Sequence, residues 1–263
     1  MKTMKDRFSE YALKEPITSV EDTSTLISSF DILSSLTSES FYVLDIPQKQ
    51  FCYVKADDLF LCGFSVDDAL RDGYKFYSKI IYPDDLLLWT NMRNVVLLYL
   101  KNFEKKRDKI DFFSCTFRLR RSYSFISLRS LSQMVYQRMK PVWVDNKLRY
   151  LICSVRSSTI KEPGNLRMYN KDGLTYEEYN LITRRWKQKA KELLTERERA
   201  ILMLAQQGKS SGEIANDLCK GHNTIRNQIK PLFSKLNVHS MWEAVEFAYD
   251  HRMIYLKQEI KEL

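Results

Sequence analysis

Apolar residues in the C-terminal part of the chain recur at helical spacing in four consecutive segments. In the clearest segment, the positions four, seven, eight and eleven residues after Ile225 are Ile229, Leu232, Phe233 and Leu236. Such spacing places the apolar side chains along one face of a helix. Three shorter segments carry apolar residues at Ile201, Leu202, Leu204 and Ala205, at Ile214, Ala215 and Leu218, and at Met241, Ala244, Val245 and Ala248. Residues 195–248 therefore predict a compact unit of four helices.

The sequence of this stretch also indicates where its helices begin. A hydroxyl residue followed three positions later by glutamate occurs at Thr195/Glu198, Ser210/Glu213 and Ser240/Glu243. In such a capping box the hydroxyl accepts from the third helical N–H, and the glutamate accepts from the N–H of the cap residue. We expect helices to begin at these three places. Asn223, at the end of a four-residue link, is expected to cap the remaining helix.

A short helix, a tight link and a longer helix with a polar outward face form a helix-turn-helix. The second helix of this motif lies in the major groove, with its N-terminal half on the base edges. Its outward residues here are Arg226, Asn227 and Lys230. Arginine and lysine can donate to guanine, and asparagine can pair with adenine, so these three are the candidate base contacts. Candidate phosphate contacts, at helix ends and in the link, are Thr224, Asn223, His222, Lys209 and Ser210.

The motifs TERERAIL, GKSSGEIA, TIRNQI and KLNV followed by EAV occur here in one order and spacing. Together they resemble the LuxR-type (NarL/GerE-like) DNA-binding domain of bacterial transcription regulators, over roughly the last quarter of the chain. The resemblance implies base contacts at Arg226, Asn227 and Lys230 and a phosphate contact at Thr224. It also implies that the helix from Ser240 mediates dimerisation. The expected dimer contacts are Met241, Ala244, Val245 and Ala248.

The chain departs from that family at four positions. Lys220 and Gly221 stand where the family usually has an apolar residue and a serine, and Gln228 stands where it usually has histidine. Pro231 falls inside the expected recognition helix, where proline removes an N–H and presses on the carbonyl four residues earlier. We expect a kink or an early loosening at Pro231, which affects the pose of Lys230 more than that of Arg226.

Between residues 26 and 158 the pattern alternates between helix and strand. Helical spacing predicts helices at 26–36, 57–61, 65–70 and 82–102, the last begun by Pro83 and acidic residues. Alternation of apolar and polar residues predicts strands at 41–46, 51–55, 111–121, 126–128, 133–139, 141–144 and 148–158. Two strands, several small helices and three long antiparallel strands resemble a PAS domain, a module for sensing or dimerisation.

A PAS-like core implies a small pocket, and aromatic residues are available to line one. They are Tyr42, Tyr53, Phe60, Trp89 and Phe117. Ordinary core packing is the simpler explanation for these side chains. No cofactor is predicted, and an unidentified small ligand in this domain is left open. The three histidines all lie in the C-terminal part, which excludes a histidine-ligated haem in the sensor.

Residues 161–194 are expected to connect the two domains. Within them, NKDG predicts the turn of a hairpin, and residues 179–194 predict a helix with Leu181, Ile182, Trp186 and Leu193 buried. Trp186 is expected to dock and so set the angle between the domains. The sequence thus predicts an α+β protein with an N-terminal arm (1–25), a PAS-like antiparallel sheet with flanking helices (26–160), a linker (161–194) and an all-α LuxR-type domain (195–263). The arm is a mobile segment or a docking helix.

Charge is distributed unevenly along the chain. Residues 1–100 carry 10 basic and 15 acidic side chains, residues 101–194 carry 22 and 9, and residues 195–263 carry 10 and 9. The overall net charge of +9 therefore comes from the middle segment. Two explanations fit: the middle segment also faces DNA, or it pairs with the acidic N-terminal part. The second is the simpler one.

Several classes of protein are excluded. The five cysteines have no framework spacing, which favours free thiols in a reducing compartment. No apolar run approaches the length of a membrane span, and the N-terminus is too polar for a secretory signal. The cytoplasm is therefore expected, with no membrane partner. A phosphorylated receiver domain needs alternating strands and helices, whereas the late strands here are consecutive. No catalytic constellation or metal-ligand cluster is present, so an enzyme is not expected.

The sequence therefore predicts a transcription regulator that binds a double-stranded DNA operator, with a PAS-like domain that senses or dimerises. A homodimer is expected because one short helix contacts too few bases for useful specificity. RNA polymerase is left open as a further partner. One alternative is a promoter-binding protein similar to a sigma factor, which copurification with core polymerase would reveal. The other is a sensor whose degenerate helix-turn-helix serves protein–protein contact, which Lys220, Gly221 and Pro231 favour.

Overall fold

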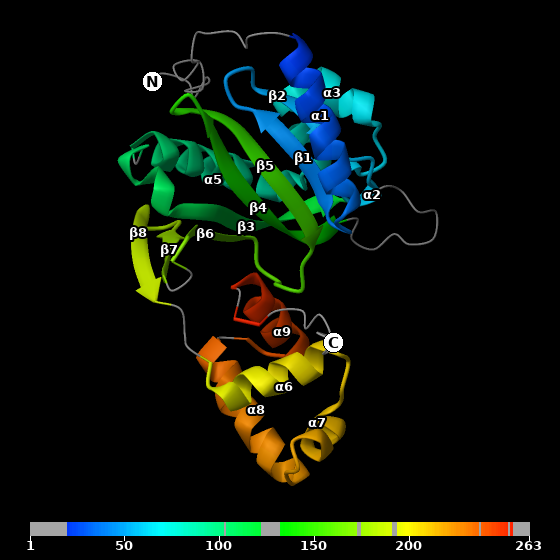
Figure 1. Cartoon of the computed structure of the whole chain (residues 1–263), viewed down its shortest axis with the longest axis vertical. Helices are drawn as coiled ribbons and strands as arrows, with labels where there is room; N and C mark the ends of the chain where they lie inside the picture. The colour runs from blue at the N-terminus through cyan, green and yellow to red at the C-terminus, as the bar shows by residue number, and fades with distance from the viewer. Residues whose placement is uncertain are drawn as a thin grey trace, which may run out of the picture. The chain divides into compact units, whose positions relative to one another are not determined.

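The computed structural model describes residues 20–102, 104–121, 132–172, 175–190, 194–236, 238–251, 253 and 254. These residues fall into two compact units, divided between Lys187 and Gln188, with Asp172–Tyr176 grouped with the second unit. This division cuts the last two strands of the sheet, which are described below with the sheet unit because they pair within that sheet. The sheet unit contains α1 (Val20–Ser35), β1 (Ser40–Asp45), β2 (Gln50–Val54), α2 (Asp58–Leu61), α3 (Val66–Asp72), η2 (Gly73–Phe76), α4 (Tyr77–Ile80), α5 (Pro83–Asn102), η3 (Glu104–Lys109), β3 (Ile110–Arg120), β4 (Ser132–Val144), β5 (Lys147–Ser157), β6 (Gly164–Asn170), β7 (Thr175–Asn180) and β8 (Arg185–Ala190) (Figure 1). The helical unit contains α6 (Glu196–Gln206), α7 (Ser211–Asp217), α8 (His222–Leu236) and α9 (Met241–Asp250).

The strands of the sheet unit form one sheet in the spatial order β2-β1-β5-β4-β3-β6-β7-β8. The pairings β1–β2, β1–β5, β3–β4, β3–β6 and β4–β5 are all antiparallel. This sheet with flanking helices, followed by four helices, confirms the predicted α+β class. Consecutive antiparallel strands also rule out a receiver domain, whose sheet requires helical crossovers between parallel strands.

The main core lies between the sheet and α5. Along β3, Phe113, Cys115, Phe117 and Leu119 are almost completely buried, as the alternation of the sequence predicts. The ring of Trp89 on α5 lies 6.2 Å from the ring of Phe117. Four of the five aromatic residues suggested as pocket lining belong to this core, namely Tyr42, Phe60, Trp89 and Phe117.

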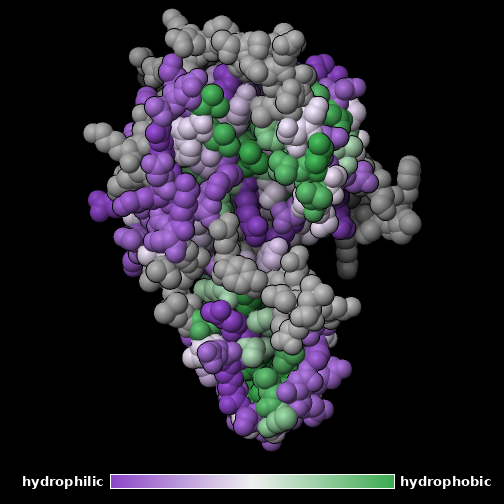
Figure 2. Space-filling view, viewed as in Figure 1, coloured by the Kyte–Doolittle hydropathy of each residue, from purple (hydrophilic) through white to green (hydrophobic). Residues whose placement is uncertain are grey.

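The opposite face of the sheet is partly covered by α1. Phe30 of α1 packs with Phe41 and Tyr53, at ring distances of 6.3 and 6.2 Å, and the Ser34 hydroxyl hydrogen-bonds that of Tyr53 at 2.6 Å. Tyr53 therefore belongs to a separate cluster and not to the main core. The other side of α1 is apolar and exposed, at Ile32, Leu33 and Leu36, and Figure 2 shows hydrophobic surface around this helix.

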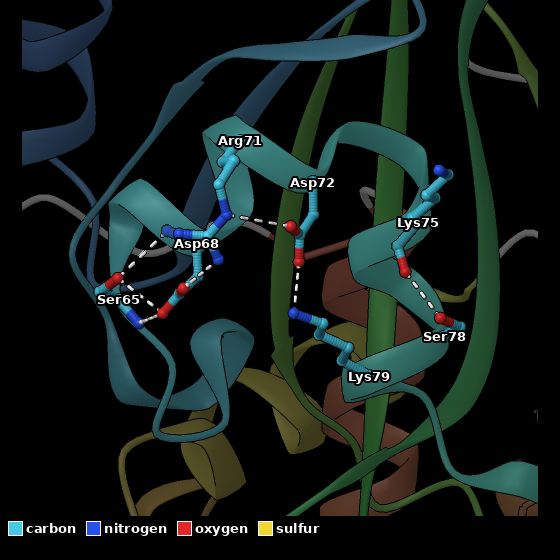
Figure 3. Close-up of polar contacts among 7 residues, drawn as sticks. All are labelled: Ser65, Asp68, Arg71, Asp72, Lys75, Ser78 and Lys79. Atoms are coloured by element: carbon cyan, nitrogen blue, oxygen red, sulfur yellow. Dashed lines mark hydrogen bonds and ion pairs between the residues drawn. The ribbon is translucent and has the colours of Figure 1, made fainter.

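A chain of polar contacts holds α3 and α4 (Figure 3). Ser65 caps α3 in a capping box with Asp68, and Arg71 pairs with the same carboxylate at 2.5 Å. Asp72 then pairs with Lys79 at 2.5 Å, which ties the end of α3 to α4. Hydrogen bonds from Ser65 and Arg71 hold the pKa of Asp68 well below its ordinary value. The acidic residues at 67 and 68 thus lie in the first turn of α3, at the positive end of the helix.

The structure corrects the expectation for residues 179–194. The described residues of this range, 179–190 and 194, contain no helix; Thr175–Asn180 and Arg185–Ala190 are strands β7 and β8, joined by a turn. Asn180 stabilises the turn because its side-chain oxygen accepts from the N–H groups of Ile182 and Thr183. Ile182, which was expected to be buried, is 92% exposed. Along β8 the side chains alternate between the two faces of the sheet, a period of two. Trp186 packs against the core, while its neighbours Arg185 and Lys187 are exposed.

Other boundaries differ less. The strands expected at 133–139 and 141–144 are a single strand, β4, which Pro141 does not interrupt. β6 and β7 are neighbours in the sheet, as a hairpin requires, while Gly173 and Leu174 between them lie outside the described residues. The segment expected to be a linker therefore extends the sheet by three strands. The arm before residue 20, the strand expected at 126–128 and Leu193 lie outside the described residues.

Candidate DNA-binding interface

The caps of the helical unit are largely those predicted. Thr195 and Glu198 form a complete capping box at the start of α6, and Ser210 and Glu213 form another at the start of α7. At α9 the Ser240 hydroxyl accepts from the N–H of Glu243 at 3.1 Å, but the Glu243 carboxylate accepts from the N–H of His239 instead of that of Ser240. The third site is therefore a cap without the reciprocal bond.

The helical unit has its own core, to which all four helices contribute. Its most deeply buried side chains include Ile201, Leu202, Ile225, Leu232 and Ala244, each fully shielded from solvent. These are positions that the helical spacing assigns to the inward faces. The packing of α6 and α9 against the α7–α8 pair therefore fixes which face of α8 remains outside.

The link between α7 and α8 is short and tightly bonded. The N–H of Lys220 donates to the carbonyl of Ala215 at 2.9 Å, and Cys219 adopts a left-handed conformation with φ of 50°. Helix α8 begins at His222, and the N–H of Ile225 donates to the carbonyl of Gly221. Asn223 therefore lies inside the first turn and does not cap the helix. The predicted cap is wrong because α7 ends at Asp217 and the four-residue link is residues 218–221, one position earlier than expected.

The three candidate base contacts lie on the exposed side of α8. Ile225 and Leu232 are completely buried, whereas Arg226, Asn227 and Lys230 are exposed. Among the described residues, none of these three side chains has a hydrogen-bond or ion-pair partner. Two cationic groups and one amide are thus held on one helical face with their hydrogen-bonding capacity unused.

The five candidate phosphate contacts fall into two groups. Asn223 and Thr224 are exposed in the first turn of α8, where backbone N–H groups favour an anion. The other three already have partners. Lys209 pairs with Asp217, the Ser210 hydroxyl is used in its capping box, and the Ser211 hydroxyl lies 2.9 Å from Nε2 of His222. The sequence did not indicate these intramolecular bonds.

Pro231 does not end the recognition helix. Helix α8 continues through Pro231 to Leu236, and Leu232 and Leu236 remain buried in the core. Proline leaves the carbonyl of Asn227 without its usual partner four residues later. Burial of the next two apolar residues keeps the helix in place despite that loss. The expected early loosening is therefore not present in the helix boundaries.

The predicted dimer contacts are not at the surface. Ala244 and Ala248 are completely buried and Val245 is 7% exposed, all within the core of the helical unit. Met241 also packs against that core. The stripe of small and apolar residues on α9 is thus its inward face, where small side chains allow close packing with the other helices. The large apolar side chain that α9 exposes is Trp242, at 65%.

Two carboxylates of the caps are electrostatically stabilised. Burial acts to raise the pKa of Glu198, but hydrogen bonds from Lys235, at 2.8 Å, and Thr195 outweigh it and hold that pKa below its ordinary value. Hydrogen bonds from the backbone and hydroxyl of Ser210 lower the pKa of Glu213. Both groups are therefore ionised at neutral pH and stabilise the positive ends of their helices.

The helical unit matches a known protein family. Residues 192–248 match the model described as bacterial regulatory proteins, luxR family. A solved structure of the transcription factor GerE is 30% identical and is covered completely, over 26% of this chain, with a TM-score of 0.24. This unit is therefore a LuxR-family helix-turn-helix domain. LuxR-family proteins are regulators and not enzymes, in agreement with the sequence.

Similar curated proteins match the same region. The response regulator protein VraR of Staphylococcus saprophyticus is 32% identical over 107 residues, which are 40% of this chain and 51% of that protein. VraR of Staphylococcus aureus is 38% identical over 63 residues, 24% of this chain and 30% of that protein. The chain thus spans about half or less of these curated relatives.

Solved structures of VqmA match along most of the chain. The Vibrio cholerae VqmA dimer, described as a LuxR-type receptor, is 14% identical over 93% of this chain and 94% of its own, with a TM-score of 0.31. None of the described helices is long and apolar enough to cross a membrane. No group of three or more potential metal ligands lies together among the described residues.

Proposed function

We propose that this protein is a cytoplasmic transcription regulator that binds a specific DNA operator through α8, under the control of its sheet unit. The observation that supports this most is the arrangement of Arg226, Asn227 and Lys230. They lie together on the second helix of a helix-turn-helix pair, exposed and without partners in the part of the chain that the structure describes. Major-groove recognition requires donors and amides that are free in this way.

Each side chain has a role in the proposal. Arg226 donates to O6 and N7 of a guanine, Asn227 pairs with N6 and N7 of an adenine, and Lys230 adds a second donor to guanine. Thr224 and Asn223 bind a phosphate at the N-terminus of α8 and so fix the register of the helix. His222, Lys209 and Ser210 approach the DNA backbone only by exchanging their present partners.

The proposed unit on DNA is a homodimer. One α8 contacts few base pairs, so two copies bound to inverted half-sites about one helical turn apart are needed for a useful specificity ratio. The resemblance to LuxR-type domains implies that α9 pairs with its counterpart. The buried stripe of α9 is used inside the unit, so the proposed contact is the outward face around Trp242, an amino acid enriched in interface hot spots.

The test of the proposed function is a substitution of Arg226. A duplex selected by the protein from random sequence is compared with an unselected duplex of the same length in a gel-shift titration. Arg226→Ala is expected to weaken binding of the selected duplex by about 1–3 kcal/mol and to relax one base position. Arg197→Ala, at an exposed arginine of α6, is the matched control and should keep the preference.

Two results would count against the proposal. If Arg226→Ala binds the selected duplex as the wild type does, Arg226 has no role in base recognition. If the wild type selects no duplex at all and binds DNA weakly and independently of salt, the helix-turn-helix serves protein–protein contact instead.

A further inference from the structure

Strand β8 carries a row of basic side chains on one face. Trp186 points into the sheet unit, where its ring lies 5.0 Å from that of Tyr99 and 5.1 Å from that of Tyr179. Since side chains alternate along a strand, Arg185 and Lys187 lie on the opposite face, and both are exposed. β8 is also an edge of the sheet, so no further strand of the described chain covers it.

Arg185 and Lys187 differ in their ion pairing from other basic residues of the segment 101–194. Arg118 pairs with Asp85, Arg149 with Asp45, Lys140 with Asp111 and Arg167 with Glu178, all within the sheet unit. Arg185 and Lys187 have no ion-pair or hydrogen-bond partner among the described side chains. The positive surplus of residues 101–194 is therefore partly neutralised inside the sheet unit, whereas on β8 it faces solvent.

The length of chain between β8 and the first helix of the helical unit is short. Seven residues, 188–194, lie between Lys187 and Thr195, the cap of α6, which makes eight steps along the chain. An extended chain of that length spans at most about 28 Å, whatever the orientation of the two units. The helical unit itself has nearly balanced charge, with 10 basic and 9 acidic side chains in residues 195–263. It therefore lacks the cationic surplus that usually supplies affinity for phosphates.

We propose that Arg185 and Lys187 of β8 bind backbone phosphates of the DNA next to the site that α8 contacts. The proposal rests on the proposed function and adds a second, sequence-independent contact from outside the helix-turn-helix. Such contacts position the protein and supply affinity, while the bases are recognised by α8. The competing role for basic residues on an edge strand is protection against edge-to-edge association of sheets.

The experiment measures salt dependence with the full chain. Affinity for the selected and the unselected duplex is measured at several NaCl concentrations for the wild type and for Arg185→Gln/Lys187→Gln. Each phosphate contact contributes about −0.9 to the slope of log K against log salt, so the double variant should have a slope shallower by about 1.8. Its affinity should fall by the same factor for both duplexes, which leaves the preference between them unchanged.

A matched control separates local contact from total charge. Lys75→Gln/Lys161→Gln removes the same charge from two exposed lysines of the sheet unit outside β8 and should keep the wild-type slope. An unchanged slope in the β8 variant, or an equal change in the control, overturns the β8 proposal and leaves the proposed function standing. Self-association of the β8 variant at unchanged slope also overturns it, in favour of edge protection. Failure of the wild type to prefer any duplex overturns the proposed function itself.

Discussion

Asp85 is a buried carboxylate, 2% exposed, that binds Arg118 through both oxygens. One oxygen also accepts from the backbone N–H of Arg118 at 2.7 Å, which fastens the start of α5 to β3. Asp84, the preceding residue, lies 4.0 Å from the same guanidinium but is 74% exposed. Adjacent carboxylates near one arginine are thus in very different surroundings.

The two aspartates should differ in their effect on stability. Asp85→Ala leaves a partly buried guanidinium and a backbone N–H without their partner, and we expect a loss of about 3 kcal/mol or more in the free energy of unfolding. Asp84→Ala removes only a screened surface pair and should cost less than about 1 kcal/mol. Urea unfolding of the two variants measures this, and equal losses would show that the Asp85 bonds are not structurally important.

Substitutions on the buried and the exposed side of α9 should have different effects, which is a second prediction at the level of single residues. Ala248 is completely buried, so Ala248→Glu places a charge in the core of the helical unit and should unfold it. Trp242→Glu lies on the exposed side and should leave the fold intact while shifting the dimer to monomer in sedimentation. If Trp242→Glu stays dimeric and Leu33→Glu on α1 gives monomers, the dimer contact lies in the sheet unit.

At the level of elements, the caps of α6 and α7 predict that the stability of the fold decreases at acidic pH. Glu198 and Glu213 have folded-state pKa values below their ordinary values. They therefore contribute stability above their unfolded-state pKa, and this contribution is lost as pH falls through the lower folded-state pKa. We expect the unfolding temperature to fall between about pH 6 and pH 3, and to fall less in Glu198→Gln/Glu213→Gln.

The control for this prediction is Glu196→Gln, at an exposed residue in the first turn of α6. It should keep the wild-type dependence on pH. If the double variant loses stability on acidification as steeply as the wild type does, the capping carboxylates do not account for the effect.

Whether a helix or strand can be predicted depends on how far apart in sequence the residues that stabilise it are. The start of α7 follows from Ser210 and Glu213, which bond each other across one turn, and the sequence alone suffices there. β8 is different. RWKQKA fits a strand only because β7 pairs beside it and the aromatic rings of Tyr99 and Tyr179 receive Trp186. Tyr99 is distant in sequence and β7 pairs with β8 only once the chain has turned back on itself, so local spacing favoured a helix.

In the candidate DNA-binding site, too, some features follow from the local sequence and others do not. The exposed face of α8 could be predicted because its apolar spacing fixes the outward positions. The contact between Ser211 and His222 could not, since it forms only after α7 and α8 have packed, and the pairing of Lys209 with Asp217 across α7 was not indicated by the apolar spacing. The burial of the α9 stripe was missed for a related reason. Small apolar residues suit a dimer contact and a close helix packing equally well, and sequence spacing does not distinguish the two.

At the level of the whole molecule, the balanced charge of the helical unit bears on how the protein binds DNA. With nearly as many acidic as basic side chains, one unit should bind DNA weakly. We therefore propose that specific binding uses two units together with additional phosphate contacts such as those proposed for β8.

The measurement that tests the central claim most directly is selection of bound duplexes from a random-sequence pool by the full chain. The account predicts a recovered site with two inverted half-sites about one helical turn apart, each with a guanine position that Arg226→Ala no longer selects. Recovery of no common sequence by the wild type, or of the same site with the same preference by Arg226→Ala, would contradict it.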